Sequence, residues 1–171
     1  CPSLRVQRSV MKYTVAVDGR EQRCCVADHP DLALLARQLQ CGFFERHGPG
    51  GMQIMAASIT QAKSQGSLAL IDCKRGDFSR TMEGYAQAML GEDSGFGGDA
   101  MPVTAYLGLD ALRPVIDRAA AVGAAVFVVV RSSNTDGHFL QNAKHDDGRT
   151  VAEALADSIT AINRESGDTI G

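Results

Sequence analysis

Two patterns of hydrophobic residues alternate along the chain. In one, short apolar runs of strand length are followed by polar residues or glycine. Such runs lie at residues 13–17, 40–44, 68–71, 101–104 and 124–130. In the other, apolar residues recur every three or four positions, which is the spacing of an amphipathic helix. This spacing predicts helices at about residues 30–39, 52–64, 79–90 and 112–122, and from 151 onward.

Strands that alternate with helices predict a parallel sheet with right-handed crossovers. The runs at 68–71 and 124–130 are apolar without alternation, which is typical of strands buried on both faces. We expect a loop at residues 20–28 and the start of a sixth strand at 170–171. The periodicity alone fits both an open doubly wound sheet and a barrel. No G-x-G-x-x-G follows the first strand, which argues against a dinucleotide-binding fold.

Composition indicates one globular domain. The chain has 171 residues, of which 44% are hydrophobic and 22% are charged, and this is enough for a hydrophobic core. The formal net charge is −3 and no basic run occurs, so the sequence offers no nucleic-acid or membrane surface. No apolar stretch approaches the ~20 residues that span a bilayer.

Cysteine and histidine usage predicts reduced thiols and no metal site. The five cysteines include the adjacent Cys24 and Cys25 and form no C-x-x-C motif, which is typical of a cytoplasmic protein without disulfides or structural zinc. The four histidines are scattered without metal-ligand spacing. The glycine-rich segment at 91–100 lacks the lysine–hydroxyl pair of a P-loop, so we expect no phosphate cradle there.

The candidate chemistry follows the apolar run at 68–71. Asp72, Lys74 and Asp77 come directly after it. Residues two apart in a strand point the same way, so Asp72 and Lys74 should emerge on one side at the end of the strand. Gly76 lets the chain turn, so Asp77 can fold back toward them. Charges also end strands that have merely reached solvent, but this end of the sheet carries the functional site in βα proteins.

Four segments resemble the orotidine 5′-phosphate decarboxylase family, in the branch that carries D-x-K-R-G-D. The resemblance runs from about residue 41 to 171, while residues 1–37 are diverged. The segments occur in the family's order and are IDCKRGDFSRT (71–81), GFFERHG (42–48), TAYLGLDALRP (104–114), and VFVVVRSSNTDG with the following LQNA and DGRTVAE (126–153).

The resemblance implies a (β/α) TIM-type barrel in one domain over residues 1–171. A closed barrel needs about 250 residues, so we expect an incomplete barrel of about five to six βα units, as a fragment or a shortened gene product. It also implies decarboxylation of orotidine 5′-monophosphate to UMP in de novo pyrimidine biosynthesis, without a metal or organic cofactor. The family's shared active sites imply a homodimer.

The same resemblance assigns roles to residues. Lys74 matches the lysine that donates the proton, and Asp72 matches the catalytic carboxylate beside it. Asp77 matches the aspartate that enters the neighbouring subunit's site.

Three further positions match substrate-binding residues. Asp18 and Thr81 match residues that contact the ribose, and Ser133 matches the serine that contacts the pyrimidine ring. From the residues alone, Asp18 also fits a simple turn, and Thr81 and Ser133 fit helix or turn capping.

Two departures from the family bear on activity. The family's lysine in the pattern K-P-x-x-x-F-F-E falls on Gln38, so the alternating Lys-Asp-Lys-Asp array lacks one positive charge. The glycine-rich loop and arginine that grip the phosphate follow later strands and have no counterpart in this sequence.

Two alternatives stay open at this stage. One is a hexulose- or gulonate-phosphate member of the same suprafamily, which keeps D-x-K-x-x-D and needs Mg²⁺. The other is a degenerate, non-catalytic barrel retained as a binding or dimerising module, which would account for Gln38.

Overall fold

A computed structural model describes residues 10–17, 20–27 and 36–166. Its strands are β1 (Val10–Val17), β2 (Arg20–Ala27), β3 (Ala36–Gln40), β4 (Leu68–Asp72), β5 (Ala100–Thr104) and β6 (Ala125–Val129). Its α-helices are α1 (Cys41–Glu45), α2 (Gly48–Ser64), α3 (Ser79–Met89), α4 (Arg113–Val122), α5 (His138–Gln141) and α6 (Val151–Ser166). The 3₁₀ turns η1 (Asp110–Leu112) and η2 (Thr135–Gly137) precede α4 and α5.

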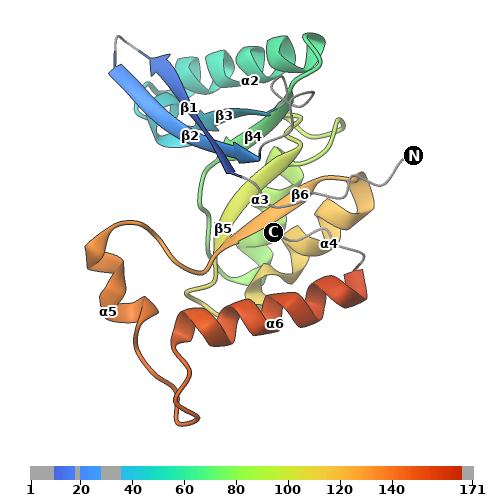
Figure 1. The fold of residues 1–171 in the computed structure, drawn as a ribbon. Helices are drawn as coiled ribbons and strands as arrows, with labels where there is room; N and C mark the ends of the chain where they lie inside the picture. The colour runs from blue at the N-terminus through green and yellow to red at the C-terminus, as the bar shows by residue number, and fades with distance from the viewer. Residues whose placement is uncertain (1–9, 18–19, 28–35, 167–171) are drawn as a thin grey trace.

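The centre of the fold is a parallel sheet in the order β3-β4-β5-β6 (Figure 1). Each of its strands leads into helix before the next strand begins, so the predicted βα repeat is confirmed. Helices α2, α3 and α4 lie along one face of this sheet and bury it. The C-terminal ends of all four strands therefore point to the same edge.

Burial differs between the two faces of the sheet. Alternate residues of β4, β5 and β6 pack under the helices, and these buried residues are Ala69, Ile71, Met101, Val103, Val126 and Val128. On the other face, Leu68 is 50% exposed and Phe127 is 45% exposed. The prediction that β4 and β6 are buried on both faces is therefore wrong at Leu68 and Phe127, because the described helices α2, α3 and α4 cover the opposite face of the sheet.

The N-terminal predictions need correction. The predicted strand at 13–17 lies within β1, but β1 pairs antiparallel with β2 in a separate two-stranded sheet. The predicted loop at 20–28 is wrong because Arg20–Ala27 is a strand. Backbone N–H and C=O groups pair between segments this close in sequence even where the side chains are polar.

The second strand of the predicted repeat is displaced. We expected a helix to residue 39 and a strand at 40–44, whereas β3 ends at Gln40 and α1 follows it. Parallel pairing with β4, from Ala36↔Leu68 to Gln40↔Asp72, overrides the helical spacing of the leucines. The start of the predicted helix, at 30–35, and the predicted sixth strand at 170–171 lie outside the described residues.

The later helices agree with their sequence signals. Helix α6 begins with a capping box, because Thr150 Oγ1 accepts the Glu153 N–H at 3.2 Å and Glu153 Oε2 accepts the Thr150 N–H at 2.8 Å. Helix α4 ends at Val122 and is capped by Gly123, whose φ of +69° is the left-handed conformation common at helix ends. In the part of the chain that the structure describes, no helix is long and apolar enough to cross a membrane.

Candidate active site

Asp72 and Lys74 form the centre of the site. Asp72 is the last residue of β4, and its side chain is only 3% exposed. The ammonium of Lys74 donates to both oxygens of the Asp72 carboxylate, at 2.5 Å to Oδ1 and 2.6 Å to Oδ2. Lys74 itself is half exposed. The predicted meeting of these two side chains is confirmed, and it presents an accessible ammonium backed by a buried carboxylate.

The backbone reaches this contact by a left-handed turn rather than by strand geometry. Lys74 has φ +43° and is the one non-glycine residue with positive φ in the described ranges. Such a conformation costs a lysine about 1–3 kcal/mol and persists only where the surroundings fix it. Just before it, the Cys73 N–H donates to the Ile71 carbonyl at 2.9 Å, so the chain has already left the strand.

Gln38 lies where the resemblance placed the family's first lysine. Its Nε2 donates to Asp72 Oδ2 at 2.5 Å from the neighbouring strand β3. The buried carboxylate therefore accepts hydrogen bonds from one cationic donor and one neutral donor. The Gln38 side chain thus lies where the first lysine of the alternating array would lie, but it carries no positive charge.

The other predicted site residues are not in direct contact with this pair. The carboxylate of Asp77 accepts the Phe78 N–H at 2.7 Å, ahead of α3, and has no ion-pair partner in the described part of the chain. Thr81 is exposed in the first turn of α3, and Ser133 is exposed in the loop after β6. Asp18 lies outside the described residues.

The loop that carries Lys74 is tied to β5. The Thr104 N–H donates to the Arg75 carbonyl at 2.8 Å, and Arg75 forms a parallel bridge with Val103. Gly76 then passes so close to Thr104 that an added Cβ would collide with the carbonyl oxygen and Oγ1 of that residue. A glycine is required here for close approach of two backbones rather than for a positive φ.

Arg75 and Glu45 are functional candidates that the sequence did not reveal. The Arg75 guanidinium forms an ion pair with the Glu45 carboxylate and lies over the Tyr85 ring, 5.2 Å from its centroid. Glu45 belongs to the GFFERHG segment and Arg75 to the IDCKRGDFSRT segment, and this membership was the one signal in the sequence that could have identified them. No local pattern relates two residues this far apart in sequence.

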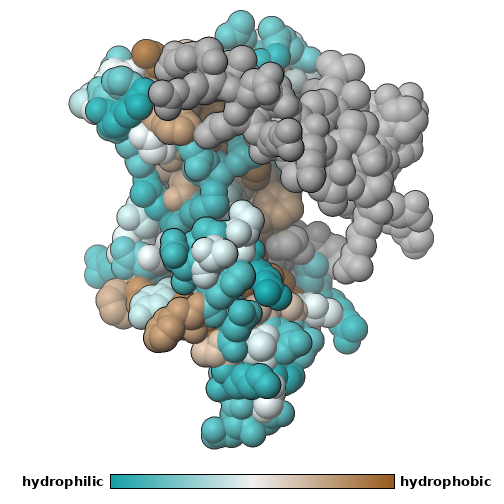
Figure 2. Space-filling view, turned by 60° about the vertical axis from the view of Figure 1, so that its left-hand side comes forward, coloured by the Kyte–Doolittle hydropathy of each residue, from teal (hydrophilic) through white to brown (hydrophobic). Residues whose placement is uncertain are grey.

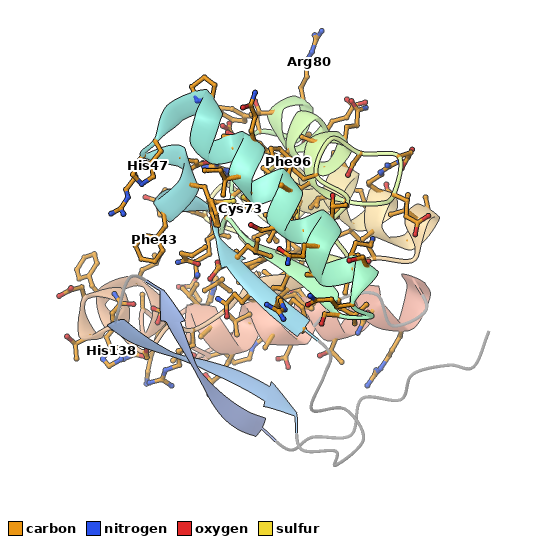
Figure 3. The ribbon with its side chains drawn as sticks, turned by 90° about the horizontal axis from the view of Figure 1, so that it is seen from above. Phe43, His47, Cys73, Arg80, Phe96 and His138 are labelled. Carbon is orange, nitrogen blue, oxygen red and sulfur yellow. The ribbon has the colours of Figure 1, made fainter. Side chains whose placement is uncertain are left out.

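Two thiols lie beside the site. Cys73 stands between Asp72 and Lys74, and Figure 3 labels it together with Phe43 of α1, near the ends of β4 and β3. Interaction with the neighbouring Cys41 thiol lowers the pKa of Cys73, and the nearby Arg75 charge acts in the same direction. The same interaction, together with burial, raises the pKa of Cys41, whose thiol donates to Met55 Sδ at 3.7 Å. Both cysteines are free thiols.

The loop that carries Ser133 has its own support. Gln141 of α5 accepts the Ser132 N–H at 3.1 Å and donates to Ser132 Oγ at 2.8 Å. This amide closes the loop between β6 and α5. Gln141 was quoted within the LQNA segment but received no role from the sequence.

The described residues contain no group of three His, Cys, Asp or Glu side chains placed to hold a metal ion. The groups that meet at the centre of the site are the Lys74 ammonium, the buried Asp72 carboxylate and the neutral amide of Gln38.

Comparisons with known proteins agree with the motif resemblance. The profile of the orotidine 5′-phosphate decarboxylase / HUMPS family matches residues 18–169. The curated orotidine 5′-phosphate decarboxylase of Myxococcus xanthus is 50% identical over 142 residues, which are 83% of this chain and 49% of that protein. That of Salinispora tropica is 44% identical over 124 residues, which are 72% of this chain and 45% of that protein. The chain thus spans about half the length of the curated relatives it matches.

Solved structures share the fold. A crystal structure from Streptomyces avermitilis, provisionally assigned as an orotidine 5′-phosphate decarboxylase, has a TM-score of 0.76 and 36% identity, over 80% of this chain and 48% of that one. The OMP decarboxylase of Leishmania donovani has a TM-score of 0.69 and 26% identity, over 80% of this chain and 51% of that one. These likenesses confirm the predicted barrel class, of which the four parallel strands here are a part.

Proposed function

The chain belongs to the orotidine 5′-phosphate decarboxylase / HUMPS family, and from this premise we propose that it decarboxylates orotidine 5′-monophosphate to UMP in pyrimidine biosynthesis. The observation that carries the proposal is the contact between the half-exposed ammonium of Lys74 and the buried carboxylate of Asp72 at the C-terminal end of β4. The curated relatives reported above are named as decarboxylases, which favours this reaction over the magnesium-dependent sugar-phosphate chemistry of the suprafamily.

The reaction requires stabilisation of the negative charge that develops on the substrate ring. When the bond from the ring carbon to the substrate carboxylate breaks, CO₂ leaves and the electron pair stays on that ring carbon. The Lys74 ammonium is a fixed positive charge that stabilises the developing carbanion and then transfers a proton to it, giving UMP. The neutral amine regains its proton from water, so no oxidant, metal or organic group enters the balance.

Asp72 has two functions in this proposal. Its carboxylate fixes the ammonium of Lys74 through two hydrogen bonds, so the donor needs little reorganisation during the reaction. It also repels the substrate carboxylate before the bond breaks, which is a contested contribution to such reactions. With Gln38 in place of a lysine, the site carries one positive charge fewer and binds the anionic substrate less favourably.

We further propose that a second copy of this chain covers the edge of the sheet around the site. Large apolar side chains are exposed in the segments that follow three successive strands, at Phe43 (42%) after β3, Phe78 (71%) before α3 and Tyr106 (78%) after β5. Figure 2 shows brown, hydrophobic patches interrupting the hydrophilic surface on one side of the molecule. Exposed apolar patches mark interaction surfaces. Asp77, beside Phe78, would then reach the neighbouring site as the family resemblance implies.

Light scattering after size-exclusion chromatography tests this arrangement. The chain is expected to elute with the mass of a dimer, and the double variant Phe78→Ser/Tyr106→Ser with that of a monomer. Ile54→Ser is a matched control, because Ile54 is 62% exposed on the outer helix α2. A monomeric parent chain would contradict the dimer. A cytoplasmic location is proposed as well, and it rests on the free thiols Cys41 and Cys73.

The experiment that tests the function is loss of the ultraviolet absorbance of orotidine 5′-monophosphate, with and without EDTA. The proposal expects decarboxylation that EDTA leaves unchanged and that Lys74→Ala reduces by at least about a thousandfold, as expected when a general acid and its charge are both removed. Lys144→Ala removes an exposed lysine far along the sequence and serves as the control. A folded chain that converts no substrate, or activity that survives in Lys74→Ala, would overturn it.

A further inference from the structure

Two motif residues have no part in the proposed chemistry, and the structure brings them together. Glu45 ends α1, after β3, and Arg75 lies in the loop after β4. Arg75 Nη2 donates to Glu45 Oε1, with the two side chains 28% and 37% exposed. The pair therefore joins the GFFERHG and IDCKRGDFSRT segments directly, at the same edge of the sheet as Asp72.

Arg75 is fixed on a second side by α3. Its guanidinium stands over the Tyr85 ring at 5.2 Å, a cation–π contact that is stronger where the cation is partly desolvated. Its Nε is buried and has no hydrogen-bond partner among the described residues, so the orientation of the guanidinium depends on Glu45 and Tyr85. Burial disfavours the charged guanidinium, but the Glu45 carboxylate outweighs this and holds the pKa of Arg75 above its ordinary value.

The residue before Arg75 is the one held in a disfavoured conformation. Lys74 has φ +43°, and a lysine keeps such a conformation only when its neighbours over-determine it. On the N-terminal side, Asp72 is fixed as the last residue of β4. On the C-terminal side, the Arg75 carbonyl is held by the Thr104 N–H, and its side chain is held by Glu45 and Tyr85.

We propose that Arg75 and Glu45 are positioning residues for the reaction, acting through Lys74. Their ion pair clamps the loop after β4 to α1 and keeps Lys74 in the left-handed conformation that directs its ammonium at the Asp72 carboxylate. Neither residue touches the substrate in this account. The inference rests on the proposed function for its kinetic consequence, but the conformation of Lys74 can be observed without any activity.

The kinetic test removes the ion pair without removing bulk. Glu45→Gln and Arg75→Gln are each expected to lower kcat by between about 10- and 100-fold, the size of effect expected from a misplacement of about 1 Å. KM for orotidine 5′-monophosphate should change less than about threefold, because neither residue binds the substrate. The kcat of the double variant should be no lower than that of the less active single variant, because both substitutions break the same ion pair. Additive losses, or unchanged kcat in both single variants, would overturn the proposal.

A matched control breaks another arginine–carboxylate contact. Arg149 pairs with Asp157 at 2.8 Å on the exposed surface of α6, and Asp157→Asn should leave kcat unchanged. Rescue separates positioning from general stability. The exchange variant Glu45→Arg/Arg75→Glu should recover part of the kcat that either reversed charge loses alone, whereas a role limited to stability would restore the melting temperature but not kcat.

Crystal structures of the parent chain and Glu45→Gln supply the readout that needs no turnover. The proposal expects Lys74 to leave the left-handed region in the variant and its Nζ to move out of hydrogen-bond distance of Asp72. If Lys74 keeps its positive φ and its contact with Asp72 in Glu45→Gln, the positioning role is wrong even where the enzyme is active. If the parent chain has no activity, the proposed reaction fails, while the structural comparison still decides the positioning role.

Discussion

Gln38 donates its side-chain amide to Asp72 across the β3–β4 boundary, at 2.5 Å between Nε2 and Oδ2. A buried carboxylate thus accepts one hydrogen bond from a neutral residue at the position where the family places a lysine. Gln38 reaches the same carboxylate that a lysine at this position would reach, but it carries no positive charge. The effect of the missing charge can therefore be tested directly by substitution.

Gln38→Lys should increase kcat/KM for orotidine 5′-monophosphate by about tenfold or more, which corresponds to ~1.4 kcal/mol of transition-state stabilisation. The added ammonium lies beside the carboxylate of Asp72 and favours the anionic substrate. Gln61→Lys adds the same charge on the exposed face of α2 and should leave the rate unchanged. A rate in Gln38→Lys that is equal to or below that of the parent chain would contradict the expected gain from a positive charge at position 38.

The conformation of Lys74 can be tested by comparing two truncations. Lys74→Gly and Lys74→Ala both remove the ammonium, so they differ only in how well the new residue accepts φ +43°. Glycine adopts this region without steric penalty, and an L-residue with a Cβ loses about 1–3 kcal/mol there, so about 1 kcal/mol remains once the greater unfolded-state entropy of glycine is set against it. Chemical denaturation should therefore show Lys74→Gly to be the more stable variant by about this amount. Equal stability would mean that residue 74 is not held in the left-handed region.

Gly76 should tolerate no side chain. In Gly76→Ala the new Cβ meets the backbone oxygen of Thr104, which cannot move without breaking the link to β5, so a loss of about 1–3 kcal/mol is expected. Gly84 is the control, because it lies within α3 with open space around it. Gly84→Ala should stabilise the helix by about 0.5–1 kcal/mol. Thermal unfolding of both variants checks the pair, and a harmless Gly76→Ala would contradict the close packing of the loop on β5.

Cys73 should react with iodoacetamide at lower pH than an ordinary thiol, because the neighbouring Cys41 thiol and the Arg75 charge lower its pKa. The thiolate is the reactive form, so a lowered pKa moves the rise in alkylation rate below the value of about 8.5 for a free cysteine. Cys41, which is buried and has a raised pKa, should stay unmodified in the folded chain.

Peptide mapping by mass spectrometry separates these two thiols from the other cysteines. In Cys41→Ala the titration of Cys73 should shift upward, because the neighbouring thiol that lowers its pKa is lost. A midpoint for Cys73 at or above the ordinary value in the parent chain, or modification of Cys41 before Cys73, would contradict the interaction.

The sequence predicted those features that depend on local pattern. The run at 68–71 is long enough and apolar enough to define β4, and the charges after it fall at the C-terminal edge of the sheet. The contact between Asp72 and Lys74 was expected from alternation along a strand. The structure reaches the same contact by a left-handed turn, which no side-chain pattern encodes.

Features decided by pairing between distant segments were missed. Leucine spacing predicted a helix to residue 39, but the partner strand β4 determines the extended conformation of Ala36–Gln40. Likewise, the contact between Arg75 and Glu45 exists only once α1 and the loop after β4 meet at one edge. Tertiary pairing of this kind overrides local propensity.

The central claim, that Lys74 protonates the ring carbon after CO₂ leaves, is tested most directly by incubating orotidine 5′-monophosphate in D₂O with the chain and with Lys74→Ala. Exchangeable protons of the ammonium become deuterons, so the account predicts CO₂ and UMP in equal amounts, with one deuteron on the former carboxylate-bearing carbon. It predicts no product above background from Lys74→Ala at equal folded concentration. Deuterated UMP formed at the same rate by Lys74→Ala, or no UMP from the folded parent chain, would contradict it.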